Sequence, residues 1–275
     1  MHSTDPSGTQ YHIACKPGDL AEYLLVPGDP ERVPRIVKFW DSAHPVSSHR
    51  EFCSFTGKYK SVSVSALSTG IGPACMAIVV NEASRIGVNT FIRVGSTGAI
   101  QENIACGDLL ISTAAVRLDG TSNCYILPEY PAVANYEVLL ALIEAAETLR
   151  MCEYHVGVTA TTADFYAGQS RPTKPRLPSE LQNLLPMLRA AGVLNFDMET
   201  ATLFTLATLY GLRSASICAV YANRCTGEFK PNEGEEEAIR VANEAMKILS
   251  EWDTLKSKKK KRWLFPSLIK IPRSR

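Results

Sequence analysis

The feature that most constrains the fold of this 275-residue chain is its alternation of apolar runs with segments of helical period. The runs are nearly continuous rather than broken by polar residues, which indicates strands in a sheet that is covered on both faces. We expect strands near residues 23–26, 61–67, 90–95, 109–116, 155–160, 193–196 and 214–221. Helical periodicity predicts helices at 73–87, 136–150, 180–191, 199–210 and 233–252.

Alternation of this kind predicts an α/β fold, a three-layer α/β/α sandwich with a mostly parallel central sheet and functional groups at the carboxyl ends of its strands. Composition does not change within residues 12–253, so we expect one domain over residues 1–255. Residues 256–275 hold nine basic and no acidic residues, and the first 255 residues carry a net charge of −8. Such a segment is able to contact acidic lipid or nucleic acid, but a flexible solvated tail is the simpler interpretation. We expect no nucleic-acid or membrane partner.

Composition also limits the class of protein. No apolar run reaches the roughly 20 residues of a membrane-spanning helix, and residues 1–5 lack the features of a signal peptide, so we expect a cytoplasmic protein. The eight cysteines form no Cys-x-x-Cys pair, which favours buried free thiols. The five histidines do not cluster with cysteines or carboxylates, which argues against a zinc or iron site.

Two expected strand ends carry an arginine close to a glycine turn. Residues 93–100, Arg-Val-Gly-Ser-Thr-Gly-Ala-Ile, follow an apolar run and predict a small-residue turn beside the Arg93 guanidinium. Residues 26–32, Val-Pro-Gly-Asp-Pro-Glu-Arg, repeat the arrangement, with Arg32 one turn into a helix that begins at Pro30. Each motif alone is typical of an ordinary turn, whereas the two together predict a phosphate site without a Walker lysine or a dinucleotide glycine pattern.

Several motifs give the chain a resemblance to a known family. They are Pro-Gly-Asp-Pro-Glu-Arg at 27–32, Ser-His-Arg-Glu-Phe at 48–52, Ser-Thr-Gly-Ile-Gly at 68–72, the stretch at 93–100 and Asp-Met-Glu-Thr-Ala at 197–201. In order and spacing they resemble the nucleoside phosphorylase superfamily, and Asp-Phe-Tyr-Ala-Gly-Gln-Ser-Arg at 164–171 resembles its pyrimidine-specific branch, the uridine phosphorylases. The resemblance implies a mixed sheet that curls into a distorted barrel. It also implies reversible phosphorolysis of uridine to uracil and ribose 1-phosphate, with deoxyuridine or thymidine as further substrates.

The phosphate and ribose subsites are implied by the same resemblance. Phosphate would contact Gly28, Arg32, Arg93 and Ser96, with Arg50 reaching in from a neighbouring subunit. Charge-assisted bonds from three guanidiniums suit a dianion. Ribose would contact Asp197, Met198 and Glu199, with His12 reaching across a subunit interface. Without the resemblance, Asp197 would serve equally well as a helix N-cap, and Arg50 and His12 would be surface residues.

For the base, the resemblance implies catalytic roles for Gln169, Arg171 and Arg224 and contacts from Phe165, Thr97 and Gly98. The amide and guanidinium groups would bind the pyrimidine carbonyls more tightly as negative charge develops on them. Purine-cleaving relatives carry an aspartate after the late strand, whereas this chain reads Tyr-Ala-Asn-Arg at 221–224, which argues against a purine.

The resemblance further implies a homo-oligomer, either a dimer or a hexamer built from dimers. In some relatives a monovalent cation bridges subunits through residues that match Glu51, Ile71 and Cys75. A cysteine is a poorer potassium ligand than a serine, so we expect no cofactor and regard inorganic phosphate as a substrate. The alternatives are another nucleoside phosphorylase, a nucleosidase of the same fold, or a non-catalytic nucleoside-binding protein. The three arginines of the phosphate subsite argue against a nucleosidase.

Overall fold

The computed structural model of the chain describes residues 8–150, 153–174 and 176–269. The strands of its sheet are β1 (Tyr23–Val26), β2 (Ser42–His49), β3 (Phe52–Tyr59), β4 (Val62–Leu67), β5 (Thr90–Ala99), β6 (Leu109–Leu118), β7 (Ala132–Val133), β8 (Tyr154–Thr162), β9 (Asn195–Asp197) and β10 (Arg213–Asn223). The α-helices are α1 (Arg32–Val37), α2 (Pro73–Arg85), α3 (Tyr136–Leu149), α4 (Ser179–Gln182), α5 (Leu184–Ala190), α6 (Thr200–Leu209) and α7 (Glu235–Lys258). Short 3-10 turns lie at Thr121–Cys124, Ala167–Gln169 and Pro266–Leu268.

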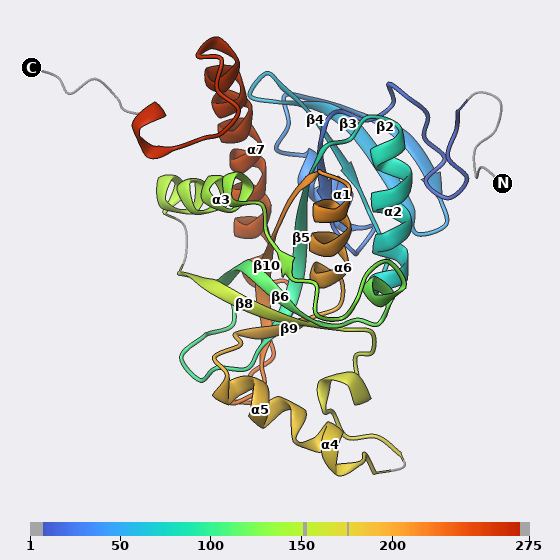
Figure 1. Cartoon of the computed structure of the whole chain (residues 1–275), viewed down its shortest axis with the longest axis vertical. Helices are drawn as coiled ribbons and strands as arrows, with labels where there is room; N and C mark the ends of the chain where they lie inside the picture. Colours follow the sequence, from blue (N-terminus) through green and yellow to red (C-terminus); the bar gives the residue numbers. More distant parts are fainter. Residues whose placement is uncertain (1–7, 151–152, 175, 270–275) are drawn as a thin grey trace, which may run out of the picture.

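Part of the sheet closes on itself. The strand order is β10-β6-β8-β9-β5-β1-β4-β3-β2, and β10 also pairs with β5, so β5, β10, β6, β8 and β9 form a ring. Strands β1, β4, β3 and β2 extend from β5 as an open sheet, and the short β7 pairs with β6 (Figure 1). Strand β5 belongs to both parts because its first four residues pair with β1 and its last two pair with β9. The predicted α/β fold with a sheet that curls into a distorted barrel is therefore confirmed.

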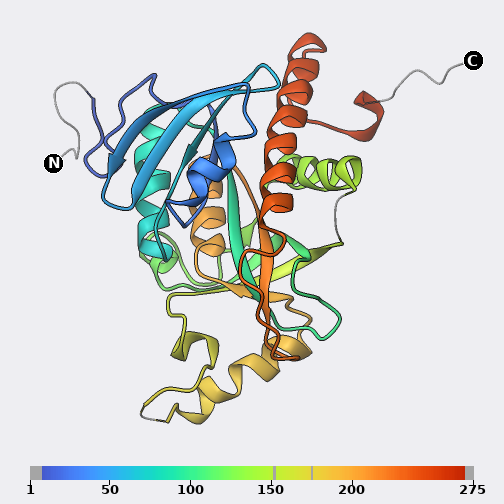
Figure 2. The ribbon, with the colours of Figure 1, turned by 180° about the vertical axis from the view of Figure 1, so that it is seen from behind.

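Helices cover both faces of the sheet, as the continuous apolar runs predict. Helices α1, α3 and α7 pack with Leu25 and Ile92 in one core cluster (Figure 1). Helices α2 and α6 pack with Leu24 and Phe91 in another, which Figure 2 shows from behind. Neighbouring residues at the start of β1 and β5 thus point into different cores, which explains why this part of both strands is largely apolar. This arrangement gives the expected three layers.

The structure differs from the expectations at the hairpin β2–β3. Its first strand has the sequence Ser-Ala-His-Pro-Val-Ser-Ser-His and is largely exposed, so it lacks the apolar signal of a buried strand. The hairpin pairs antiparallel within itself and with β4. Parallel and antiparallel pairings are consequently equally frequent among the described strands, and the sheet is mixed rather than mostly parallel.

The small-residue stretch after Arg93 is a second difference. We expected a turn there, but β5 continues to Ala99 because β10 pairs with it along its whole length. Gly95 allows this close pairing, since a Cβ at that position would lie 2.7 Å from Arg93 Nη2 and 2.8 Å from Cys218 Sγ. The helix expected at 180–191 is divided into α4 and α5.

The boundary expected at residue 255 falls inside α7, which continues to Lys258. Lys256 and Leu264, from the expected tail, are buried against the body of the protein. Residues 1–7 of the expected domain and 270–275 of the expected tail lie outside the described residues, and the division at residue 255 stays a prediction.

Two further expectations concerned buried free thiols and the absence of a membrane-spanning helix. The described cysteines are free thiols, but only Cys15, Cys106 and Cys218 are buried, and Cys124 is exposed. Cys152 lies outside the described residues. Within the described ranges, no helix combines the length and the apolar character that crossing a membrane requires.

Candidate active site

A cavity of about 1270 Å³ lies where the carboxyl ends of β1, β5 and β10 meet the loop that leads into α6. Residues far apart in the sequence meet there, as expected for the ends of neighbouring strands. The predicted site residues that line it are Gly28, Arg32, Glu51, Ile71, Cys75, Arg93, Ser96, Thr97, Gly98, Phe165, Gln169, Arg171, Asp197, Met198, Glu199 and Arg224. Arg50 and His12 are predicted site residues that are absent from its lining.

Arg93 lies between two carboxylates at the centre of this cavity. Its Nε donates to Asp197 Oδ2 at 2.9 Å, and its Nη2 lies 2.6 Å from Glu199 Oε2. Burial alone would lower the pKa of the Arg93 guanidinium, but Glu199, Cys218 and Asp197 outweigh burial and raise it. Burial raises the pKa of Glu199, against the opposing effect of Arg93. The Gly72 N–H donates to the other oxygen of Glu199 at 2.6 Å, which fixes the carboxylate at the cavity wall.

The Asp197 carboxylate is saturated by protein donors. Besides Arg93, it accepts from the Thr161 hydroxyl at 2.6 Å and from the Thr200 N–H at 3.0 Å. The Thr200 hydroxyl donates to it as well. These contacts give Asp197 a structural role: it orients Arg93 and accepts the first N–H of α6, although the N-cap residue of that helix is Glu199. The Asp197 side chain has no exposed surface.

Arg32 occupies the neighbouring wall within a second buried network. Its Nε donates to Glu235 Oε2 at 2.8 Å, its Nη1 to the Val94 carbonyl at 3.1 Å and its Nη2 to the Tyr221 hydroxyl at 3.3 Å. The Tyr221 hydroxyl also donates to Glu235. Burial, followed by the hydrogen bond to Glu235, raises the pKa of Tyr221 to about 12, so the phenol stays protonated at neutral pH. Glu235 thereby holds Arg32 in a fixed orientation beside the cavity.

The glycine turns of the β1 and β4 strand ends lie against each other at this wall. The Gly70 N–H donates to the Gly28 carbonyl at 2.9 Å, and a Cβ on Gly28 would lie 3.2 Å from the Gly70 carbonyl oxygen. Gly70 has a φ of +75°, which favours glycine at this position. A Cβ on Gly70 would lie 2.7 Å from Glu51 Cγ, so the glycines allow these loops to pack closely at the cavity wall.

At the other end of the cavity two arginines have no acidic partner in the part of the chain that the structure describes. The Arg171 guanidinium lies 4.2 Å from the centre of the Phe165 ring, and its Nε is buried with no hydrogen-bond partner among the described residues. Arg224 Nη1 donates to the Gln169 carbonyl at 2.8 Å. Burial lowers the pKa of Arg171, and burial together with the nearby Arg171 charge lowers the pKa of Arg224 to about 10. This end of the cavity is therefore prepared to accept a negative charge.

The Thr97 hydroxyl makes its hydrogen bonds within the protein. Its Oγ1 donates to the Phe196 carbonyl at 2.6 Å and accepts from Asn195 Nδ2 at 2.6 Å. The hydroxyl thus joins β5 to β9.

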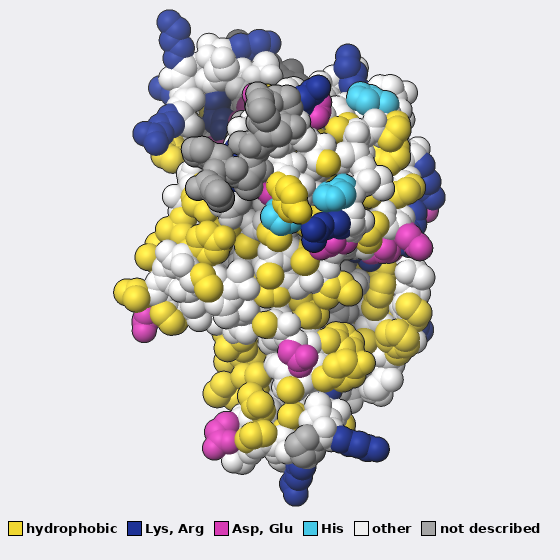
Figure 3. Space-filling model, turned by 90° about the vertical axis from the view of Figure 1, so that its right-hand side faces the viewer, with side chains coloured by type: hydrophobic (Ala, Val, Ile, Leu, Met, Phe, Trp, Pro, Cys, Tyr) yellow, Lys and Arg dark blue, Asp and Glu magenta, His cyan; other side chains and the backbone are white. Residues whose placement is uncertain are grey.

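Arg50 and His12 lie together on the outer surface. Arg50 occupies the turn of the β2–β3 hairpin with a φ of +56°, and its guanidinium lies 5.8 Å from the centre of the Tyr11 ring. His12 Nδ1 lies 2.6 Å from Glu82 Oε1, and His49 Nδ1 lies 2.9 Å from the His12 carbonyl. Figure 3 shows histidine and basic side chains gathered among hydrophobic ones on this face. A single protomer therefore does not bring them into its own cavity.

Comparison with known proteins identifies the family. The family model described as "Phosphorylase superfamily" matches residues 22–252. The chain is 57% identical to a uridine phosphorylase of Thermococcus kodakarensis over 95% of this chain and 94% of that protein. A uridine phosphorylase of Salmonella typhimurium is 39% identical, with 87% and 97% covered. A guanosine phosphorylase of Halorubrum lacusprofundi is 36% identical, with 86% and 92% covered. The chain belongs to the phosphorylase superfamily.

The predicted cation-site residues of this phosphorylase are a poor set of ligands for potassium. Burial raises the pKa of the Cys75 thiol, which keeps its proton and donates to Glu51 Oε1 at 3.5 Å. Ile71 could offer only its backbone carbonyl. Among the described residues, no cluster of three or more histidines, cysteines or carboxylates is placed to hold a metal ion. The expectation that the phosphorylase needs no cofactor stays a prediction.

Asn223 has a structural role in the phosphorylase loop that follows β10. Its Nδ2 donates to the carbonyls of Gln101 and Ile104, at 2.9 and 2.6 Å. Its Oδ1 accepts the N–H groups of Cys225 and Thr226, at 2.7 and 3.1 Å. All of its hydrogen-bonding capacity is used to shape the loop that carries Arg224, and none remains for a base.

Sequence reasoning missed residues that support the phosphorylase cavity from other parts of the chain. Glu235 lies 203 positions after Arg32 and reads as an ordinary acidic residue at the start of a helix. Tyr221 reads as part of a buried strand. Phe229, 70% exposed, lines the cavity from the loop after β10. The sequence holds no signal that separates Glu235 from the other acidic residues at the start of α7. Only the structure shows that its carboxylate is buried.

Proposed function

We propose that this chain is a uridine phosphorylase that reversibly converts uridine and phosphate into uracil and ribose 1-phosphate. The observation that carries the proposal is the pair of cations, Arg171 and Arg224, that have no acidic partner among the described residues and lie at one end of the cavity beside Gln169. A uracil anion places its charge on carbonyl oxygens, which guanidinium and amide donors stabilise. Cleavage of a purine requires instead an acid that protonates the ring, and Asn223 cannot provide one.

The reaction that we propose divides the cavity into three subsites. Phosphate binds between Arg32 and Arg93 with Ser96 and the Gly28 turn, and one of its oxygens attacks C1′ of the ribose. The C1′–N1 bond breaks, and its electron pair leaves with the uracil ring toward Arg171 and Arg224. The phosphate ester loses its proton to solvent, and the uracil anion takes one up to give uracil. Glu199 accepts hydrogen bonds from ribose hydroxyls, and its negative charge favours the positive charge that builds at C1′. Met198 packs on the sugar, and Phe165 stacks on the base.

We also propose that the functional unit is a homo-oligomer of at least two subunits. Arg50 and His12 would then complete the phosphate and ribose subsites of a neighbouring protomer. Their position on the same outer face as the exposed Tyr11 ring supports this assignment. A cytoplasmic location is proposed on the basis of the free thiols, which a reducing compartment maintains.

The experiment that tests the proposed function measures base release from the purified protein. With uridine, uracil release followed by absorbance should require phosphate and should produce ribose 1-phosphate. Uracil release without phosphate would identify a nucleosidase. Faster cleavage of inosine or guanosine than of uridine would assign the chain to the purine-cleaving phosphorylases, and absence of cleavage with every nucleoside would identify a binding protein.

A further inference from the structure

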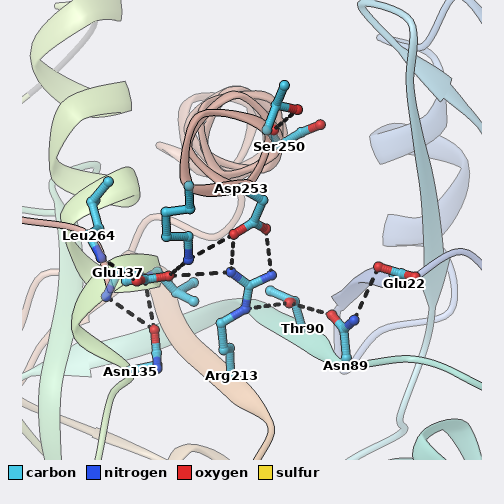
Figure 4. A network of polar contacts seen from close by, with 12 residues as sticks. Glu22, Asn89, Thr90, Asn135, Glu137, Arg213, Ser250, Asp253 and Leu264 are labelled. Carbon is cyan, nitrogen blue, oxygen red and sulfur yellow. Dashed lines mark hydrogen bonds and ion pairs between the residues drawn. The ribbon is translucent and has the colours of Figure 1, made fainter. Parts of the chain in front are cut away.

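The C-terminal segment (residues 256–269) is attached to the body of the protein at two points by one carboxylate. Lys256 Nζ pairs with Glu137 and lies 2.9 Å from Asp253 Oδ1. The Leu264 N–H donates to the other oxygen of Glu137 at 3.0 Å (Figure 4). The Leu264 side chain is only 5% exposed, so the second attachment is apolar as well as polar. The residues between these two points form a fixed loop at the end of α7.

The end of α7 displays a run of cations in this loop. The Lys261 N–H donates to the Lys256 carbonyl, the Lys260 N–H donates to the Ser257 carbonyl, and Lys260 has a φ of +51°. These bonds form a Schellman turn, which reverses the chain after the helix. The side chains of residues 258–262, four lysines and an arginine, are exposed, and no ion pair joins them to any described acidic residue. Their charge is therefore free to attract an external anionic surface.

Apolar side chains are exposed directly beside these cations. Trp263 is 56% exposed, and Phe265 and Ile269 are each 39% exposed. The buried Leu264 separates Trp263 from Phe265, so that the segment is held down at its middle while the aromatic rings on both sides face solvent. The Arg262 guanidinium lies 4.8 Å from the centre of the Trp263 ring. Tryptophan next to basic residues is typical of the boundary between lipid headgroups and acyl chains.

The C-terminal segment differs in charge from the rest of the protein. The first 255 residues carry a net charge of −8, whereas residues 256–275 hold nine basic and no acidic residues, so the excess of positive charge lies at the C-terminal end of the sequence. A nucleic acid would contact phosphates with a broad basic surface, which the acidic body does not provide. The aliphatic Ile269 has no stacking partner in a nucleic acid, whereas it gains free energy on entering a bilayer.

We propose that the C-terminal segment docks this protein on an anionic lipid bilayer. Residues 258–262 contact the headgroups, and Trp263 and Phe265 enter the boundary with the acyl chains. The expectation of no membrane partner assumed that the tail is flexible and solvated. The contacts of Lys256 and Leu264 with Glu137 instead hold this segment in one orientation on the protein. The proposal is independent of the reaction in the cavity.

The first test measures flotation of the full-length protein with lipid vesicles. It should float with vesicles that contain phosphatidylglycerol and remain unbound with pure phosphatidylcholine, and about 0.5 M salt should weaken binding. The triple variant Lys259→Gln, Lys260→Gln, Lys261→Gln should lose roughly 100-fold in partition coefficient. The matched control Lys16→Gln, Lys58→Gln, Lys174→Gln changes the net charge equally at exposed sites elsewhere and should bind as the wild type does.

A second test separates lipid insertion from simple charge attraction. Anionic vesicles should shift the tryptophan emission of the wild type to shorter wavelength, and the Trp263→Phe variant should lose this shift. Unchanged uridine cleavage in all variants would show that they fold. The proposal is overturned by wild-type protein that ignores anionic vesicles, by equal loss in both triple variants, or by an emission shift that persists in Trp263→Phe. Binding to a single-stranded RNA oligonucleotide without flotation would also overturn it.

Discussion

The arginines of the cavity differ in the partners that the protein gives them. Arg93 is paired with two buried carboxylates and Arg32 with one, whereas Arg171 and Arg224 have none among the described residues. An anion that binds between Arg32 and Arg93 meets cations whose charge is already partly balanced by carboxylates. Its binding is therefore weaker than at unpaired cations, which permits its release. Charge that develops at the second pair meets cations without competition. These differences favour phosphate binding at one end and stabilisation of a leaving anion at the other.

Replacement of Arg171 by alanine should remove one donor to the leaving base. We expect kcat/KM for uridine to fall by roughly 100- to 1000-fold, the scale of losing one transition-state donor, while the KM for phosphate barely changes. Steady-state measurement of uracil release checks both parameters. Lys174→Ala, an exposed cation on the same loop, is the matched control and should retain wild-type kinetics. An Arg171→Ala enzyme with normal uridine kinetics would remove Arg171 from the base subsite.

Substitution of Asn223 by aspartate tests whether this position shapes the loop or acts on the base. The carboxylate would face the carbonyls of Gln101 and Ile104 in a position that is 2% exposed. We expect a loss of about 2–4 kcal/mol in the free energy of unfolding, measured as a Tm lower by roughly 5–15 °C. The exposed Asn232→Asp should leave Tm unchanged. New inosine cleavage by Asn223→Asp at wild-type Tm would contradict the structural role.

Individual residues were predictable where a motif surrounds them. Arg93 and Glu199 belong to local motifs that mark them as candidates, and both line the cavity. Sequence left open whether Asp197 is a helix N-cap, and only the structure shows that Glu199 is the N-cap of α6 while Asp197 accepts hydrogen bonds from Thr161 and Thr200. Glu235 was missed because its partner Arg32 is distant in the chain, and a pairing of that kind leaves no periodic or spacing signal.

At the scale of elements, the apolar runs predicted the strands that are covered on both faces. Strand β1 begins and ends where it was expected. The hairpin β2–β3 was missed because β2 is a solvated edge strand and the hairpin is held by backbone pairing, which polar sequences provide as well as apolar ones. The continuation of β5 past Gly95 was missed because a distant strand, β10, determines it.

Asp253 joins several elements through one carboxylate. It accepts two hydrogen bonds from Arg213 of β10 and one from Tyr23 of β1, and α7 carries it. Burial alone would raise the pKa of Asp253, but these partners outweigh it and lower the pKa from 3.8 to about 2. Because the folded pKa lies below the unfolded one, the stabilisation is complete above pH 4 and is lost as pH falls through about 2. Its size is about 2 kcal/mol.

The corresponding prediction compares Asp253→Asn with the wild type. The variant should unfold at lower urea concentration at pH 6, and the difference between the two proteins should shrink as the pH falls from about 4 toward 2. Glu251→Gln, an exposed position on the same helix, should behave as the wild type at each pH. A difference that stays constant with pH would mean that the charge of Asp253 does not contribute.

At the scale of the whole molecule, the position of Arg50 outside the cavity makes assembly testable through activity. If Arg50 completes a neighbour's site, mixing Arg50→Ala with Glu199→Ala under subunit exchange places both lesions in one site of each heterodimer. Up to about half of the heterodimer sites should then recover activity. Mixing Arg93→Ala with Glu199→Ala is the control, since each protomer damages its own site and no recovery should follow. Absence of recovery in the first mixture, despite demonstrated exchange, would place Arg50 outside the neighbour's site.

The ring of strands has a consequence for how the protein is made. Thr90 of β5 contacts Arg213 of β10 across 123 positions of the chain. A ribosome that adds about 5–20 residues per second takes roughly 6–25 s to synthesise that interval. During this time β1 is available to pair with one edge of β5, but the edge that β10 covers has no partner yet because β10 has not been translated. The nascent chain thus exposes one unpaired edge of an apolar strand for many seconds, and a chaperone that binds extended apolar segments would protect it until β10 is synthesised.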